Sequence, residues 1–207
     1  MKRPLVGLSA VLLNACLMLN GCGSSPPTHF YVLSNLPRPA HLNPNAAPDI
    51  AVGVGPVDLP EYLDKPQIVT RTGQNGLNLA EFDKWGESLK DNTSQVLAEN
   101  PSILLPSKKV HAYPWKRSDM IEYQVLVNVS RFDHTEGGDT VLNTRWSILS
   151  GDGKTELYAK EASYVEHPAG ADYSSIVAAM DRALAQFSRD IATTLNGLAT
   201  EGKLSSP

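Results

Sequence analysis

The first 22 residues constrain this chain more than any other stretch. Two cations, Lys2 and Arg3, precede an apolar run from Leu5 to Leu19, and small residues stand just before Cys22. A positive start, a short apolar run and small residues at a cleavage point are the pattern of a secretory signal peptide. The run covers about fifteen residues, whereas a helix needs about 20 to cross the core of a bilayer. We therefore predict that residues 1–21 are a signal peptide that is removed.

The sequence Leu19-Asn20-Gly21-Cys22 resembles the bacterial lipobox, in which the cysteine becomes the first mature residue and carries thioether-linked lipid. Two or more acyl chains hold a protein stably on a membrane, so lipid on Cys22 would be a permanent anchor. Gly23 and Ser24 follow, and no aspartate stands after the cysteine, where it would resemble an inner-membrane retention signal. We therefore expect the protein at the periplasmic face of the outer membrane.

The composition of the chain is that of an ordinary globular protein. Of its 207 residues, 42% are hydrophobic and 19% are charged, and the formal net charge is -4. Loss of the two signal-peptide cations makes the chain more acidic, which argues against a nucleic-acid partner. The length suits one core. We predict a lipidated tether over 22–27, a single domain over 28–198 and a polar tail over 199–207.

The residues that usually carry catalysis or bind metals are scattered or missing from recognisable motifs. Cys16 lies in the signal peptide and Cys22 would carry lipid, so the mature chain has no disulfide. None of the histidines stands at a spacing typical of zinc ligands, and no nucleophile elbow or phosphate loop occurs. We predict no metal, no cofactor besides the lipid on Cys22 and no catalytic residue. An enzyme that uses the acidic cluster Asp58, Glu61 and Asp64 is an alternative.

Alternating and β-branched segments predict a sheet with several strands. We expect strands over 28–33 and 49–57, a hairpin of 66–72 with 77–80 around an Asn-Gly turn, and a short strand over 109–113. A further short strand piece is expected over 103–105. Three longer strands, over 121–132, 140–149 and 156–165, form an antiparallel meander. In the strand over 49–57, small residues alternate with bulky ones, so a helix is expected to pack on the small-residue face.

Two segments have the periodicity of amphipathic helices. In residues 81–100, the apolar side chains of Phe82, Trp85, Leu89 and Val96 recur near every 3.6 positions, and Pro101 ends the segment. Residues 173–198 follow a cap at Asp172 or Ser174, and Gly197 or Gly202 ends this second helix. Its apolar stripe consists of Ile176, Met180, Leu184, Phe187, Ile191, Leu195 and Leu198. The predicted fold class is α+β, a mostly antiparallel sheet covered by two long helices in a single domain.

Three sequence blocks together resemble one protein family. They are Val52-Gly-Val-Gly-Pro-Val57, Leu59-Pro-Glu-Tyr-Leu-Asp-Lys-Pro-Gln-Ile-Val-Thr-Arg71 and Glu81-Phe-Asp-Lys-Trp85 with Glu87 and Leu89. This pattern is similar to the PqiC/YmbA family of ABC-type transport auxiliary lipoproteins, and the likeness covers Tyr31 to about Leu198. Ser88 stands where the family pattern leads us to expect proline.

The resemblance implies a non-enzymatic outer-membrane component that supports envelope integrity. Family members dock on a periplasm-spanning MCE-domain protein similar to PqiB and help to move phospholipid between the two membranes. They resemble ring-forming oligomers, so a homo-oligomeric ring is expected here. None of these expectations follows from composition or spacing alone.

The proline-framed turn after the second strand is the candidate interface with a partner or a neighbouring subunit. Its residues are Pro60, Tyr62, Leu63, Asp64 and Pro66, and Gln67 and Arg71 follow in the next strand. Apolar side chains on an exposed turn are typical of protein contacts, but the same turn could simply fold back on the sheet. We expect Trp85 to be a structural core residue.

Two non-enzymatic alternatives stay open. The protein could be a carrier that binds a lipid monomer in a pocket over the small-residue face of Ala51, Gly53 and Gly55. It could also be an assembly lipoprotein of a different export machine.

Overall fold

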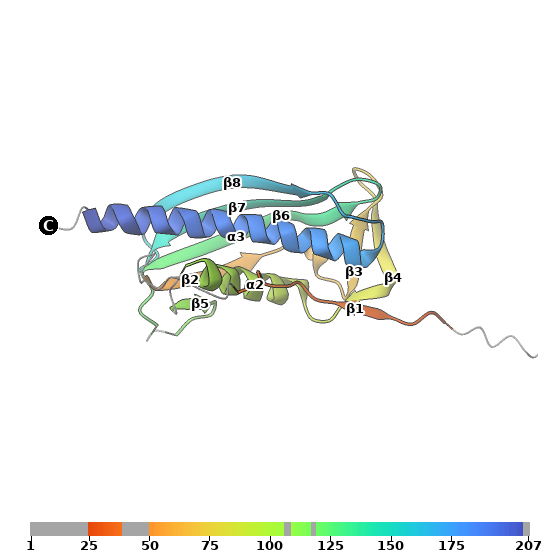
Figure 1. Ribbon diagram of the computed structural model, residues 1–207, viewed down its shortest axis with the longest axis horizontal. Helices are drawn as coiled ribbons and strands as arrows, with labels where there is room; N and C mark the ends of the chain where they lie inside the picture. The colour runs from red at the N-terminus through yellow and green to blue at the C-terminus, as the bar shows by residue number, and fades with distance from the viewer. Residues whose placement is uncertain (1–24, 39–49, 106–108, 117–118, 205–207) are drawn as a thin grey trace, which may run out of the picture.

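Three long antiparallel strands form the largest part of the sheet in the computed structural model, which describes residues 25–38, 50–105, 109–116 and 119–204. They are β6 (Tyr123–Thr135), β7 (Thr140–Ser150) and β8 (Glu156–Glu166), paired in sequence order (Figure 1). In β7 every second side chain is buried, as the alternating sequence requires. The predicted meander is confirmed.

The other edge of β6 pairs with two strands placed one after the other. The first half of β6 runs parallel to β2 (Val52–Asp58), and its last residues run parallel to β3 (Gln67–Arg71). Beyond β3 lies β4 (Leu77–Trp85), antiparallel, as the hairpin prediction required.

Two short strands lie at the edges of this half of the sheet. β1 (His29–Tyr31) runs parallel to β4, and β5 (Val110–Ala112) runs parallel to β2. The predicted α+β class holds, but the sheet is mixed rather than mostly antiparallel. Alternation gives the face of each residue and not the direction of the neighbouring strand, so the parallel pairs had no signal in the sequence.

Both α-helices pack on the same face of the sheet (Figure 1). They are α2 (Leu89–Leu104) and α3 (Tyr173–Leu204), so α3 is by far the longer. The predicted stripe of α3 is buried from Ile176 to Leu195, and Phe187 meets the ring of Trp146 on β7 at 5.6 Å between centroids. The Ser175 amide donates to Asp172 Oδ1, which confirms the Asp172 cap. The helix does not end at Gly197 or Gly202 but continues to Leu204.

The region between the hairpin and α2 differs most from the prediction. Residues 81–85 belong to strand β4, where pairing with β1 and β3 outweighs their helical periodicity. The helix begins only after Ser88, whose hydroxyl caps it by accepting from the Asp91 amide. Pro101 does not end α2: the Leu105 amide donates to the Pro101 carbonyl, and the helix runs on to Leu104. The predicted strand piece over 103–105 is therefore wrong.

The small-residue face of β2 is covered by aromatic side chains and not by a helix. A Cβ atom added at Gly53 would lie 2.9 Å from ring carbons of Trp115, and one added at Gly55 would lie 2.6 Å from Cβ of Tyr113. Helix α2 packs against β2 from the other side, where Val52 and Val54 are buried. The space expected for a lipid monomer is thus filled by side chains.

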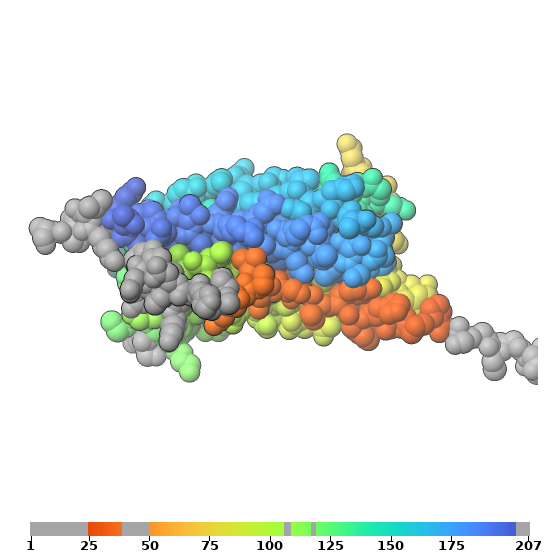
Figure 2. Space-filling view, viewed as in Figure 1, coloured from red at the N-terminus to blue at the C-terminus, as the bar shows by residue number. Residues whose placement is uncertain are grey.

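The N-terminal segment that follows β1, residues 34–37, lies directly against α3 (orange on blue in Figure 2). No helix within the described ranges combines the length and apolarity that a membrane span requires.

Candidate functional site

The turn between β2 and β3 contains a short 3-10 helix, η1 (Glu61–Leu63), framed by prolines as the sequence indicated. The Leu63 amide donates to the Pro60 carbonyl, and the Trp85 amide donates to that of Pro66. The turn is therefore fastened to β4 as well as to itself.

Arg71 at the end of β3 points to the sheet face without helices. Its neighbour Thr70 is buried and lies beside Tyr173 of α3, and successive side chains of a strand point to opposite faces. We call this helix-free side the open face.

On the open face, Tyr62 and Arg71 converge on the buried carboxylate of Asp133. The Tyr62 hydroxyl donates to Asp133 Oδ2 at 2.7 Å, and Arg71 Nε donates to the same oxygen at 2.8 Å. The other oxygen, Oδ1, accepts from Arg131 Nε at 2.8 Å. The Asp133 side chain is completely buried, so these three donors replace the water it would otherwise bind.

Arg71 is held by more than its ion pair. Its NH2 group donates to the Tyr62 hydroxyl at 3.1 Å, and its guanidinium carbon lies 5.2 Å from the centre of the Tyr62 ring. Burial, followed by the hydrogen bond to Asp133, raises the pKa of Tyr62, so the hydroxyl stays a donor. This cluster holds the turn in place. Both oxygens of the Asp133 carboxylate accept hydrogen bonds from protein donors, which is not the arrangement of a general base.

Two exposed leucines extend this site along the hairpin. Leu77 is the register partner of Arg71, and Leu79 is the partner of Val69, so both lie on the open face. Their side chains are 41% and 46% exposed. We call Tyr62, Arg71, Leu77 and Leu79 the hairpin patch. An apolar pair beside an arginine and a tyrosine has the composition of a protein interface.

The other predicted site residues divide between surface and core. Asp64 and Pro66 are exposed, and Pro60 and Gln67 are partly buried. Leu63 is only 2% exposed and packs in the core, so its side chain is not available to a partner as the sequence had suggested. Trp85 is also a core residue, at 6% exposure. Cys22 lies outside the described residues.

Sequence reasoning missed Asp133, Arg131 and the two leucines. The signal for the first two was a pair of opposite charges within a strand that otherwise alternates apolar residues. The signal for Leu77 and Leu79 was their i, i+2 spacing in the returning strand of the hairpin. Neither pattern shows which residues these side chains contact, so both could be recognised only in the folded structure.

The three acidic residues of the turn lie at the surface. Asp58 pairs with Lys90 of α2 at 3.3 Å, and Glu61 and Asp64 are exposed. Across the described residues, no group of histidine, cysteine, aspartate and glutamate side chains is arranged to hold a metal ion.

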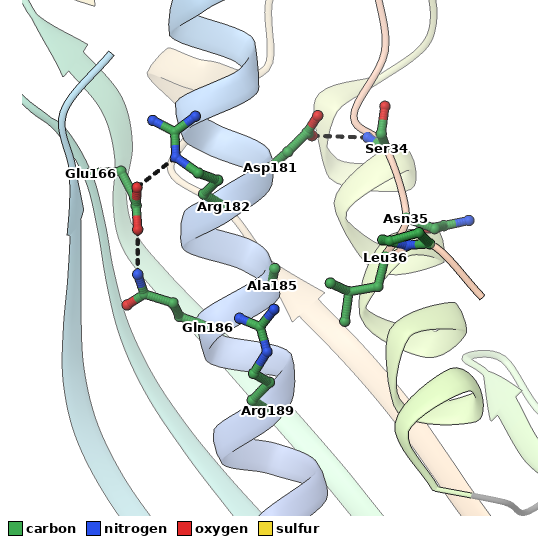
Figure 3. A pocket seen from close by; sticks show the side chains of 10 residues that line it. Ser34, Asn35, Leu36, Glu166, Asp181, Arg182, Ala185, Gln186 and Arg189 are labelled. Carbon is green, nitrogen blue, oxygen red and sulfur yellow. Dashed lines mark hydrogen bonds and ion pairs between the residues drawn. The ribbon is translucent and has the colours of Figure 1, made fainter. Parts of the chain in front are cut away.

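A second feature is the groove of about 350 Å³ where the N-terminal segment lies beside α3 (Figure 3). The Ser34 amide donates to Asp181 Oδ1 at 2.8 Å, and burial raises the pKa of Asp181. Two residues further on, the segment is held by Asn100 of α2, whose Oδ1 accepts from the Leu36 amide at 2.7 Å. The segment after β1 is therefore fastened to both helices by side chains.

Solved structures share this fold at low sequence identity. A crystal structure of an uncharacterized protein is 19% identical, with a TM-score of 0.68, and the match covers 82% of this chain and 99% of the other. A protein from Xanthomonas campestris is 14% identical, with a TM-score of 0.70, over 86% of this chain and 100% of the other. Both likenesses show the fold alone.

No curated protein is similar to the chain at a significant level. A family model, described as the ABC-type transport auxiliary lipoprotein component, matches residues 31–192 and so includes β3, β4, the hairpin patch and most of α3. The chain belongs to the family of ABC-type transport auxiliary lipoprotein components.

Proposed function

We propose that this protein is a non-enzymatic outer-membrane lipoprotein of an MCE-type system that moves phospholipid between membranes. Lipid on Cys22 anchors it at the periplasmic face, and its folded domain docks on a periplasm-spanning PqiB-like partner. Membership of the transport auxiliary family supports the general role. The outer-membrane placement rests on Gly23 and Ser24, since no aspartate follows the cysteine.

The observation that carries the docking role is the hairpin patch. Leu77 and Leu79 keep more than two fifths of their surface exposed, and Leu77 is the register partner of Arg71 in the buried cluster around Asp133. That cluster holds Tyr62 and Arg71 in one arrangement before any partner arrives, which lowers the entropy cost of binding. A rigid apolar surface with one arginine suits contact with a protein, either the MCE partner or a second copy in a homo-oligomeric ring.

The environment of Asp133 supports a role without catalysis. A catalytic carboxylate must reach a substrate, and this one is buried with each oxygen accepting at least one hydrogen bond from a protein donor.

The experiment is a cross-linked pull-down from envelopes with two variants in which exposed leucines are replaced by aspartate. The double variant Leu77→Asp with Leu79→Asp places charge in the hairpin patch, and Leu157→Asp places one on β8, where the leucine is 40% exposed. We expect the wild type and Leu157→Asp to capture an MCE-domain protein, and the double variant to lose most of it. If the double variant unfolds at the same temperature as the wild type, its loss of capture reports lost docking and not misfolding.

Two outcomes would overturn parts of this proposal. Capture of a different export machine with no MCE protein would favour an assembly lipoprotein. Equal capture by all three proteins would remove the hairpin patch from the interface. Mass measurement of the N-terminal peptide tests the lipid on Cys22 independently.

A further inference from the structure

Strand β1 displays two large apolar side chains to solvent. Phe30 is 68% exposed and Val32, just after the strand, is 51% exposed. Exposing a phenyl ring next to water forgoes the stabilisation that burial would provide. Because the two residues are two positions apart in extended chain, they share one face.

The orientation of these side chains is fixed by their neighbours. Tyr31 donates its hydroxyl to Asp83 Oδ1 at 2.9 Å, and His29 Nδ1 lies 3.4 Å from the same oxygen. The Gly86 amide donates to the Tyr31 carbonyl at 2.8 Å. With His29 and Tyr31 held on the side of Asp83, Phe30 must point to the opposite side. Its exposure is therefore built into the sheet and does not result from a loose terminus.

The chain itself indicates what lies near this surface. Phe30 stands eight residues after Cys22, and a fully extended chain of eight residues spans at most about 29 Å. The described chain leaves the body at this end, next to β1 and the β3–β4 hairpin (Figure 1). A lipid on Cys22 would thus keep this end, rather than the end where β6 begins, near the membrane.

The strand next to β1 adds a cation at the same place. Lys84 on β4 is the register partner of Phe30, so their side chains lie on the same face. Aromatic rings prefer the interfacial region of a bilayer, and a lysine beside them can reach lipid phosphate while its methylene groups stay near apolar surface.

We propose that Phe30, Val32 and Lys84 form a membrane-contact surface, with the two apolar side chains in the headgroup region and the lysine at the phosphates. This inference rests on the lipid anchor of the proposed function. The contact would add a second attachment point and so fix the orientation of the domain on the membrane. A lipid chain alone leaves that orientation free.

The test uses the processed, acylated full chain carrying Phe30→Cys, in which the new cysteine is the single free thiol. It is labelled with an environment-sensitive fluorophore and reconstituted on phosphatidylethanolamine vesicles with phosphatidylglycerol and a headgroup-level nitroxide lipid. Met120→Cys is the matched control, because Met120 is 81% exposed and precedes β6, which begins at the opposite end (Figure 1). Vesicle flotation first selects anchored protein.

We expect the label at position 30 to be quenched several-fold more strongly by the nitroxide lipid than the label at position 120. Aqueous iodide should show the reverse order. In floating protein, iodide quenching of position 30 equal to that of position 120 would overturn the contact while leaving the anchor intact. A label at position 30 shielded from both quenchers would assign this surface to a contact with a second copy of this chain, the one protein in the vesicles, and would also overturn the proposal.

If the protein did not float with the vesicles, both the lipid anchor and this inference would be contradicted. Loss of partner capture in the envelope pull-down, by contrast, leaves the vesicle result unchanged, because no partner is present there. Substituting Val32→Cys gives an independent reading at 51% exposure should the label at position 30 disturb the sheet.

Discussion

The hydroxyl group of Tyr62 donates a hydrogen bond of 2.7 Å to Oδ2 of Asp133, 71 residues further along the chain. The same oxygen accepts from Arg71 Nε, so the turn after β2 and the end of β3 share one buried carboxylate on β6. The position of the hairpin patch on the sheet therefore depends on Asp133.

Replacing Asp133 with alanine should lower the free energy of unfolding by about 2–3 kcal/mol. Breaking a buried ion pair from one side costs about 3–5 kcal/mol, and Arg71 and Arg131 keep 21% and 26% of their side-chain surface exposed. Water can therefore recover part of the loss. Urea unfolding measures the change, and Asp64→Ala, at an exposed position of the same turn, should stay within about 0.5 kcal/mol of wild type. Equal stability of both variants would show that the cluster contributes nothing.

Replacing Tyr62 with phenylalanine should cost about 1.5–3 kcal/mol, because the hydroxyl donates to the Asp133 carboxylate and accepts from Arg71, and hydrogen bonds to charged groups are worth about that much. The ring that lies against Arg71 stays, so the loss reports the hydroxyl alone. In the Asp133→Ala background the same change should cost less, because the acceptor of the hydroxyl is already gone and only the hydrogen bond from Arg71 is left to lose. The control is Tyr113→Phe, at a tyrosine that is 54% exposed. An equal loss of unfolding free energy in both backgrounds would argue against the hydrogen bond between Tyr62 and Asp133.

The meander, the hairpin and α3 were predictable because each depends on a repeating local pattern. Strands β6, β7 and β8 alternate along their lengths and are joined by short turns, and α3 carries a stripe that a sheet can bury. In such segments local preference and tertiary packing agree.

Residues 81–105 were not predictable for the opposite reason. Phe82, Trp85 and Leu89 recur at a helical spacing, yet residues 83–85 pair with β1, a strand far away in the sequence. Asn100, just before Pro101, donates from Nδ2 to Ser188 of α3 and accepts from the Leu36 amide, so tertiary contacts hold the helix through the proline. The Asp133 cluster likewise joins three segments, and no local pattern records that meeting.

Replacing Gly53 with alanine should displace Trp115. The new Cβ would lie 2.9 Å from two ring carbons, so the indole must move, and overpacking of this kind costs about 1–3 kcal/mol. Trp85 and Trp146 are buried, so a shift of the emission to longer wavelength in the folded protein reports Trp115 entering water. The matched control is Gly197→Ala in α3, where nothing lies within 4 Å. It should gain about 0.5–1 kcal/mol. An unchanged spectrum for Gly53→Ala would contradict the packing.

The last prediction concerns pH and Asp181, which accepts from the Ser34 amide. Burial raises the pKa of this carboxyl, against the opposing effects of the Ser34 hydrogen bonds and of Arg182. The folded state then holds a proton at pH values where the unfolded chain, with a pKa of about 3.9, has released it. Stability therefore falls as the pH rises from that value through the raised pKa. Asp181→Asn removes this loss and keeps an oxygen for Ser34.

We expect Asp181→Asn to be more stable than wild type at pH 7, with the difference vanishing below about pH 4 because both side chains are then neutral. Urea unfolding at a series of pH values measures this. Asp172→Asn is the control, and its effect on stability should have the opposite sign. Hydrogen bonds from Ser175 lower the pKa of Asp172, so the charged carboxylate stabilises the fold above its ordinary pKa. This contribution is lost in acid, and Asp172→Asn should therefore be less stable than wild type at pH 7. If the difference in unfolding free energy between Asp181→Asn and wild type did not change with pH, burial would not raise the pKa of Asp181.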